Sequence, residues 1–216
     1  MSLPRAFGAG ARGIGARAPA DPPAETYTVA LDPGTLRAGA AVYRGQRLVW
    51  AYLSKEHPGK LLDRAYVAAF DVADRLLAEC PFPLFSQKNT KIYAELPRVI
   101  MRGGSRTPGD PDSILALVLL VGAFSTRLVD RGFSTAENIR PADWKTQVEK
   151  KAMTARIESC LAPCEIAVLE SFRGVRNKKI DHNVLDAVGV GMKPLKRIPI
   201  AGTPIQMWQK KDSDFK

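Results

Sequence analysis

Residues 27–43 read YTVALDPGTLRAGAAVY, and this stretch decides how the rest of the chain is organised. Its first five residues form a short apolar run that stops at Asp32-Pro33-Gly34, a strong turn signal. A second run of β-forming residues covers residues 38–43, and a third covers residues 47–53 after the short link at 44–46. Three short strands joined by tight links predict an antiparallel meander.

The segments after the meander show helix and strand patterns in turn. Apolar side chains recur at helical spacing over residues 61–77, and KIYAEL (residues 91–96) reads as a strand that Pro97 ends. We then expect a helix at 114–129 capped by Asp112 or Ser113, a strand at 133–138, a helix opened by Pro141, and helical segments at 154–161, 165–172 and 181–192. This element order predicts an α/β protein of the RNase H-like fold, a mixed five-stranded sheet with three antiparallel strands first, flanked by helices.

The chain length and the two ends bound the domain organisation. At 216 residues the chain can bury one good core, so we expect a single folded domain over residues 25–200. Residues 1–24 are rich in Gly, Ala and Pro and carry three arginines, which predicts a disordered basic tail. A DNA-contacting arm and an organelle transit peptide are the other interpretations of this tail. Residues 201–216 are expected to form a C-terminal tail.

The composition narrows the class of partner and the compartment. Net charge is +10, an excess that favours a polyanionic partner because neutralised phosphates release counterions. Three cysteines are too few for a disulfide framework, so we expect free thiols and a cytoplasmic protein. The longest apolar run, residues 114–124, has about half of the roughly twenty residues that a membrane span needs. We therefore expect no membrane association and no secretory signal.

Two acidic residues occur where strands end. Asp32 directly follows an apolar strand, as a turn-former or as a ligand at the edge of the sheet. Glu95 lies within a β-rich run, where Glu is a poor strand residue, and it shares a face with Lys91 and Tyr93. A structural salt bridge or a ligand role would each explain Glu95.

A third acidic group lies in the sequence DHNVLDA, residues 181–187. On a helix, His182 and Asp186 are four residues apart and face the same way, while Asp181 is best placed as the N-cap. An ion pair between the histidine and an aspartate is the plain structural alternative. Gly189, one turn beyond Asp186, would let this helix approach another backbone closely.

Together these acids fit one kind of chemistry. Hydrolysis of a phosphodiester needs neutralisation of charge at the attacking and leaving oxygens, which two divalent ions about 3.5–4 Å apart provide. Mg²⁺ prefers oxygen ligands such as carboxylates, and a neutral histidine can position or deprotonate the attacking water. No P-loop, nucleophile elbow, zinc motif or dinucleotide fingerprint is present in the sequence.

Four segments in this order resemble the RuvC-type Holliday-junction resolvases. TVALDPGTLRAGAAVY resembles their first two strands, where an Asp-x-Gly-x-x-x-x-Gly pattern begins the active site, and KIYAELP resembles their second acidic strand. IRPADWKTQVEKK and DHNVLDAVGVGM look like the bacteriophage branch of that family. The resemblance covers roughly residues 27–192.

The resemblance implies a site and an assembly. Asp32, Glu95 and Asp186 would ligate two Mg²⁺ ions per active site, with Mn²⁺ as a substitute, and His182 would fill a fourth catalytic position with Asp181 in reserve. Cellular resolvases place Asp or His three residues before the last aspartate, and this chain departs from them with Asn183. The family also implies a homodimer that nicks two strands of a four-way junction. Residues 114–129 could supply its interface or be buried within one chain.

Basic residues near the acids are candidate DNA contacts, with solvated loops as the alternative. They are Arg98, Arg102, Arg106, Lys145, Arg176, Lys178 and Lys179. Trp144 is either a core aromatic or a base-stacking platform. The leading hypothesis is a metal-dependent endodeoxyribonuclease that resolves branched DNA, in the host cytoplasm if phage-encoded. A nuclease for other branched or flapped phage replication DNA and a catalytically weak nucleic-acid-binding module are the alternatives.

Overall fold

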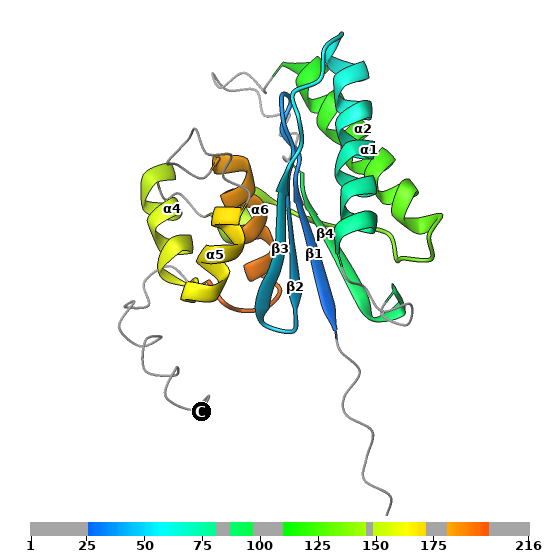
Figure 1. The fold of residues 1–216 in the computed structure, drawn as a ribbon. Helices are drawn as coiled ribbons and strands as arrows, with labels where there is room; N and C mark the ends of the chain where they lie inside the picture. Colours follow the sequence, from blue (N-terminus) through cyan, green and yellow to red (C-terminus); the bar gives the residue numbers. More distant parts are fainter. Residues whose placement is uncertain (1–25, 81–86, 97–109, 146–148, 172–180, 199–216) are drawn as a thin grey trace, which may run out of the picture.

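One five-stranded mixed sheet, in the order β3-β2-β1-β4-β5, organises the computed structural model (Figure 1). The structure describes residues 26–80, 87–96, 110–145, 149–171 and 181–198. Pairs β1–β2 and β2–β3 are antiparallel, whereas β1–β4 and β4–β5 are parallel. The strands are β1 (Tyr27–Asp32), β2 (Gly39–Arg44), β3 (Arg47–Leu53), β4 (Thr90–Glu95) and β5 (Glu137–Ile139). The RNase H-like fold class expected from the element order is confirmed.

The parallel pairing of β1 with β4 positions the site. Leu31 lies opposite Ala94 in the register, so the next residues, Asp32 and Glu95, emerge side by side where the two strands end. The carboxyl edge of the sheet therefore brings together two acids that are 63 positions apart in sequence.

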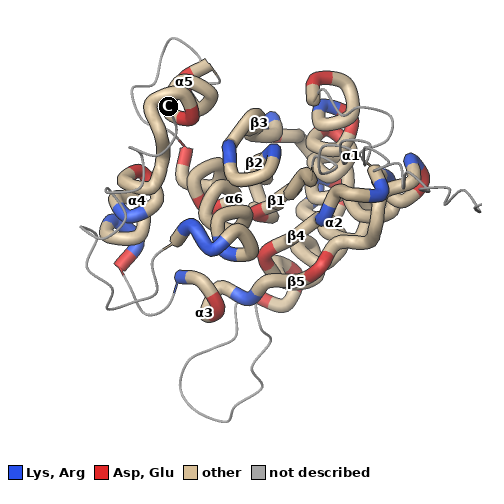
Figure 2. The backbone as a smooth tube through the Cα atoms, turned by 90° about the horizontal axis from the view of Figure 1, so that it is seen from below, with Lys and Arg blue, Asp and Glu red and all other residues tan. Residues whose placement is uncertain are grey.

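Helices cover both faces of the sheet, and the end-on view separates the two layers (Figure 2). On one face lie α1 (Leu61–Glu79) and α2 (Pro111–Val129). The other face is covered by α4 (Lys150–Ser159), α5 (Pro163–Ser171) and α6 (His182–Met192), with the short α3 (Pro141–Trp144) beside them. A single 3-10 turn, η1 (Gln87–Asn89), directly precedes β4 in the chain.

Alternating side chains of the central strands feed two separate cores. Val29 and Leu31 of β1 point toward α1 and α2, whereas Ala30 points toward α6. In β2, Val42 belongs to the first core and Tyr43 to the second. Because a strand exposes successive side chains to opposite faces, the central strands are apolar on both sides, which is typical of a sheet covered by helices twice.

Several boundaries differ from the sequence predictions. Helix α2 begins at Pro111 and is capped by Asp110, whose carboxylate accepts a hydrogen bond from the Ser113 amide, so the expected cap at Asp112 or Ser113 was wrong. Strand β5 has only three residues, because Phe133 turns into the first core instead of pairing. Helix α4 starts four residues earlier than expected. The tails at 1–24 and 201–216 lie outside the described residues.

Helix α2 has an unusual composition. By length and composition it could cross a membrane, with a mean hydropathy of 1.8 over its best window. One side of it is nevertheless part of the protein core, through Ala116, Leu120, Phe124 and Leu128. Packing in the core therefore explains the apolar residues on the inner side of α2. It does not explain the exposed apolar residues on the outer side, such as Leu115 and Val118.

Candidate active site

Two buried carboxylates form the base of the site. Asp32 is 8% exposed at the end of β1, and Glu95 is 7% exposed at the end of β4. Burying an ionised carboxylate is costly unless it is paired or binds a cation. Their position at the carboxyl edge of a parallel strand pair is where sheets of this kind place ligand-binding side chains.

Helix α6 brings the third acid, Asp186, to the same edge. The start of this helix docks tightly on the loop between β1 and β2, because a Cβ atom at Gly39 would overlap the Asn183 carbonyl. A Cβ at Gly34 would lie 2.8 Å from the Asn183 side-chain nitrogen, which donates a 2.6 Å hydrogen bond to the Arg37 carbonyl. The glycines of the Asp-x-Gly-x-x-x-x-Gly pattern thus make room for the helix that carries Asp186.

Two neighbouring residues at the end of α3, Trp144 and Lys145, donate hydrogen bonds to Glu95. The Trp144 indole Nε1 donates a 2.8 Å hydrogen bond to Oε2 of Glu95. The Lys145 ammonium lies 3.1 Å from Oε1 of Glu95 and 2.9 Å from Oδ2 of Asp186. Lys145 therefore bridges two of the three acids, while Trp144 fixes the orientation of one of them.

Trp144 is held in place by its fit against α6. The ring is buried, and a Cβ at Gly189 would overlap its six-membered ring. The expectation that Gly189 permits a close backbone approach was therefore wrong, since the group that approaches is an aromatic side chain. Burial also decides that Trp144 is a core aromatic, and its indole N–H has a partner as buried tryptophans usually require.

The electrostatics follow from burial and crowding of like charges. Burial, with added repulsion from Glu95 and Asp186, raises the pKa of Asp32 well above its ordinary range, although Lys145 and Lys150 act in the opposite direction. Burial also raises the pKa of Glu95, despite the opposing effect of Lys145. The nearby lysines therefore do not fully compensate the burial of these two carboxylates. A bound cation would stabilise their charged forms.

The donor set fits a hard divalent cation, although the side chains would have to rearrange. Within the described part of the chain, no three acidic, histidine or cysteine side chains converge closely enough to enclose an ion as they stand. Lys145 occupies the space between Glu95 and Asp186. Three carboxylates against one bridging ammonium still leave a net negative charge, so the site as a whole attracts divalent cations such as Mg²⁺ or Mn²⁺.

The fourth position predicted from the sequence lies on the rim of the site. Asp181 caps α6, as expected, by accepting a hydrogen bond from the Asn183 amide. His182 is 55% exposed, and its Nδ1 lies 3.7 Å from Asp181. Arg37 approaches the other oxygen of Asp181 at 3.6 Å. Asp181 is therefore committed to capping α6 and to an ion pair with Arg37, and the exposed His182 ring lies beside it.

Most of the predicted DNA contacts fall in segments that the structure does not describe. Those residues are Arg98, Arg102, Arg106, Arg176, Lys178 and Lys179. Lys145 is described and contacts the acids themselves. The hydrogen bond from Trp144 to Glu95 was missed by sequence reasoning, although the neighbouring Trp-Lys pair behind Pro141 was the available signal.

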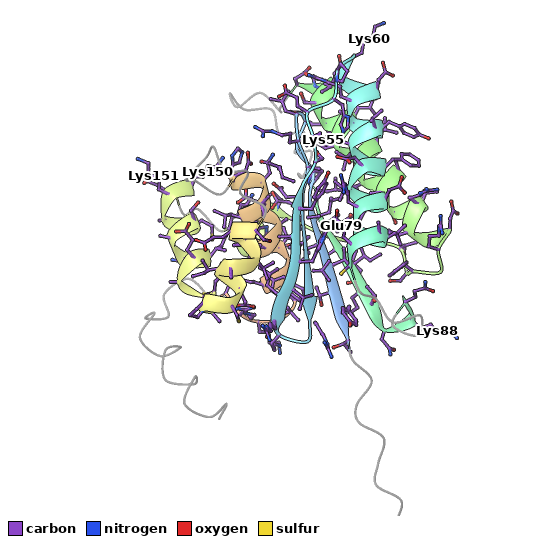
Figure 3. All side chains as sticks on the ribbon, in the orientation of Figure 1. Lys55, Lys60, Glu79, Lys88, Lys150 and Lys151 are labelled. Atoms are coloured by element: carbon purple, nitrogen blue, oxygen red, sulfur yellow. The ribbon has the colours of Figure 1, made fainter. Side chains whose placement is uncertain are left out.

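Other basic residues lie around the carboxyl edge. Figure 3 places Lys55 and Lys60, between β3 and α1, and Lys150 and Lys151, at the start of α4, toward the end of the molecule where β1 finishes. Lys88 lies at the opposite end. The exposed lysines at this end of the molecule provide positive charge that can attract a polyanion.

Comparison with known proteins adds little at the level of sequence. No protein-family model and no curated protein sequence matches the chain. Among solved structures, RuvC of T. thermophilus in complex with a Holliday junction substrate is 13% identical, with a TM-score of 0.43, and the match covers 78% of this chain and 92% of that one. A second Thermus thermophilus RuvC structure gives 14% identity, the same TM-score and the same coverage.

A third match is a ROK hexokinase from Thermus thermophilus, 19% identical with a TM-score of 0.34, covering 65% of this chain and 40% of the hexokinase. Likenesses of this size carry no functional weight. The fold rests on the sheet order of this chain, and the function has to be argued from its own side chains.

Proposed function

We propose that this protein is a metal-dependent endodeoxyribonuclease that resolves branched DNA, with four-way junctions as the preferred substrate. The observation that carries the proposal is the convergence of Asp32, Glu95 and Asp186 at one edge of the sheet, with two of them buried and raised in pKa. Acids that are costly to bury and incompletely balanced are characteristic of a functional site. The preference for junctions rests on the resemblance of four sequence segments to RuvC-type resolvases.

In this proposal the three carboxylates hold two Mg²⁺ ions, with Mn²⁺ as a substitute. When bound, such ions neutralise charge on the phosphodiester and lower the pKa of a water molecule. Trp144 keeps Oε2 of Glu95 fixed, so that the carboxylate presents its other oxygen toward the site. His182, exposed at the first turn of α6, is the candidate to orient the attacking water and accept its proton, with Asp181 as the alternative.

The DNA backbone would pass over the carboxyl edge of the sheet. Lys150 already acts on Asp32 electrostatically, and Lys151 follows it on α4. Lys55 and Lys60 lie between β3 and α1, away from α4. With a net charge of +10, these residues favour a protein that binds phosphates.

Paired cleavage of two strands needs two sites, so we place a second copy of the chain on the outer face of α1 and α2. This face has a groove lined by Tyr66, Phe70, Val118, Leu119, Gly122 and Ala123, and Leu115 and Val67 are exposed beside it. Exposed apolar patches of this kind mark association sites. Sedimentation of the wild type and of Val118→Asp tests this: the variant should become monomeric, and equal association would exclude the face.

Two other functions remain as alternatives. A nuclease for flapped or otherwise branched replication DNA would use the same acids with a different DNA path. A catalytically weak binding module would retain the basic surface without turnover. The raised pKa of Asp32 favours an enzyme over a binding module, because a pure binding surface has no use for buried, repelling acids.

A panel of synthetic DNAs tests the proposal. The purified protein is incubated with Mg²⁺ or Mn²⁺ and a mobile four-way junction, a flap, a linear duplex and an RNA–DNA hybrid. Paired, symmetric and ligatable nicks in the junction are the expected result. Preferential cutting of the flap would replace junction resolution with the first alternative, and tight junction binding without cutting in either metal would favour the second.

A further inference from the structure

Lys145 has an unusual place for a residue of a nuclease site. Its ammonium lies between two acids, 3.1 Å from Oε1 of Glu95 and 2.9 Å from Oδ2 of Asp186. The Lys145 side chain is only 25% exposed, and its Nζ lies 4.7 Å from the centre of the Trp144 ring. A cation held between two carboxylates and over an aromatic face is stabilised by all three groups.

The oxygens that Lys145 contacts are the ones a metal ion would need. Oε2 of Glu95 is already engaged by the Trp144 indole, which leaves Oε1 as the oxygen directed into the site. Lys145 occupies that oxygen, and it also engages Oδ2 of Asp186. An ion that used both of these oxygens would have to take the place of the ammonium.

A lysine is better suited than an arginine to act as a counter-ion that a metal ion can displace. The lysine ammonium is a compact point charge on a flexible four-carbon stem, whereas a guanidinium binds carboxylates in a rigid fork. The fixed contact to Glu95 comes from Trp144, which is wedged against Gly189 and is part of the core. Glu95 can therefore keep its orientation when Lys145 leaves.

We propose that Lys145 is a built-in cation surrogate, which holds Glu95 and Asp186 together before a divalent ion binds and is displaced when the ion arrives. Lys145 thereby sets metal affinity: it stabilises the metal-free protein and competes with the metal for two carboxylate oxygens. The inference rests on the proposed function for the presence of a metal centre, but it concerns metal binding and needs no DNA cleavage.

Metal titration of matched variants tests the proposal. Binding of Mn²⁺ is measured at about pH 8 by calorimetry, or by the electron paramagnetic resonance signal of free Mn²⁺, without DNA. The variant Lys145→Met keeps an unbranched apolar stem on the Trp144 ring and removes the charge. It should bind Mn²⁺ about tenfold more tightly, which corresponds to about 1.4 kcal/mol. Lys88→Met, exposed at the opposite end of the molecule, controls for net charge and should change the affinity little.

Thermal unfolding gives a second reading on the same variants. Without metal, Lys145→Met should melt below the wild type, because two acids lose their shared counter-ion, and saturating Mn²⁺ should raise its Tm by more than it raises that of the wild type. Equal or weaker Mn²⁺ binding by Lys145→Met than by the wild type would overturn the proposal.

Chemical labelling of the wild type avoids any dependence on variant folding. An amine-acylating reagent followed by mass spectrometry should modify Lys145 slowly in the metal-free protein and faster at saturating Mn²⁺, and an unchanged rate would also overturn the proposal. A protein that binds Mn²⁺ in this way but never cuts branched DNA would refute the proposed function and leave the role of Lys145 intact.

Discussion

The six-membered ring of Trp144 occupies the space that a side chain at Gly189 would fill, and the indole Nε1 donates a 2.8 Å hydrogen bond to Glu95. A glycine of α6 is thus coupled to a carboxylate at the end of β4 through one ring. The position of Glu95 depends on how closely α3 and α6 approach each other.

Substitution of Gly189 by alanine should therefore damage the site and the fold together. The added methyl group overlaps Trp144, and overpacking of this kind costs about 1–3 kcal/mol. Denaturant unfolding should show this loss, and tryptophan fluorescence should report the displaced ring. Gly122→Ala is the matched control at dilutions where the chain is monomeric, because a Cβ at that helical position meets nothing within 4 Å in a single chain, although Gly122 lines the groove proposed for the second copy. It should leave stability unchanged or raise it by up to about 1 kcal/mol.

Replacement of Asp32 by asparagine should stabilise the metal-free protein. Burial raises the pKa of Asp32 above its ordinary value of 3.8, so the folded state binds this proton more tightly than the unfolded state. The cost of the charged form grows as pH rises through that ordinary value and is complete above the raised one. At neutral pH, in a metal chelator, Asp32→Asn should melt higher than the wild type, by about 2–4 °C for each kcal/mol gained.

Glu158→Gln removes one negative charge from an exposed position of α4 and provides the control for net charge. An Asp32→Asn variant that melts at or below the wild-type temperature would show that burial of the charged Asp32 carboxylate does not destabilise the folded protein. Addition of Mg²⁺ should narrow the difference, because the ion stabilises only the protein that retains the acid.

The ion pair of Glu165 with Arg197 should give the fold a distinct acid sensitivity. Glu165 accepts hydrogen bonds from the amides of Leu48 and Ala162 and from both terminal nitrogens of Arg197, each of the latter at 2.7 Å. Burial acts to raise the pKa of Glu165, but Arg197 and the two amides outweigh it, and the net pKa is lowered from 4.5. Its stabilising contribution is therefore complete above pH 4.5 and is lost as pH falls through the lowered value.

Glu165→Gln leaves Arg197 without its counter-charge and should cost about 3–5 kcal/mol at neutral pH. The difference in unfolding free energy between wild type and variant should shrink as the pH is lowered below 4.5 and through the lowered pKa of Glu165, which denaturant titrations at several pH values will show. If the difference in unfolding free energy did not depend on pH, the stabilisation by Glu165 would come from its hydrogen bonds and not from its charge.

His182 and Asp181 can be separated by single substitutions. If His182 accepts the proton of the attacking water, His182→Ala should slow cleavage by about 10²–10⁴-fold at saturating Mg²⁺ and remove the corresponding limb of the pH–rate profile. Asp181→Ala should mainly lower stability, by about 1 kcal/mol, through loss of the helix cap. The reverse pattern, with a fast His182→Ala and an inactive Asp181→Ala, would assign the fourth position to Asp181.

The order of elements was predictable because strong local signals mark it. Asp32-Pro33-Gly34 ends β1, and the apolar periodicity of α1 and α6 is clear in the sequence. Boundaries without a local signal were less accurate. Strand β5 is a case in point: Phe133 has high β-propensity, but its burial against α2 outweighs that preference.

The acids of the candidate site were predictable for a different reason. Glu95 is a poor strand residue at a strand end, and parallel pairing with β1 makes its meeting with Asp32 a consequence of register. The contacts of Trp144 and Lys145 could not be predicted, since they depend on how α3 packs across β4 and α6. A basic residue next to an acid cluster in sequence does not show whether it faces DNA or the acids.

The central claim is that the carboxyl edge of the sheet is a nuclease centre. The most direct test is to measure whether the variant Asp32→Asn loses metal-dependent cleavage of DNA. Cleavage of a mobile four-way junction in Mg²⁺ is compared among the wild type, Asp32→Asn and the exposed control Glu158→Gln, with junction binding measured in a chelator. The wild type and the control should cut, whereas Asp32→Asn should bind the junction and fail to cut it. Cleavage by Asp32→Asn at the wild-type rate would contradict the account.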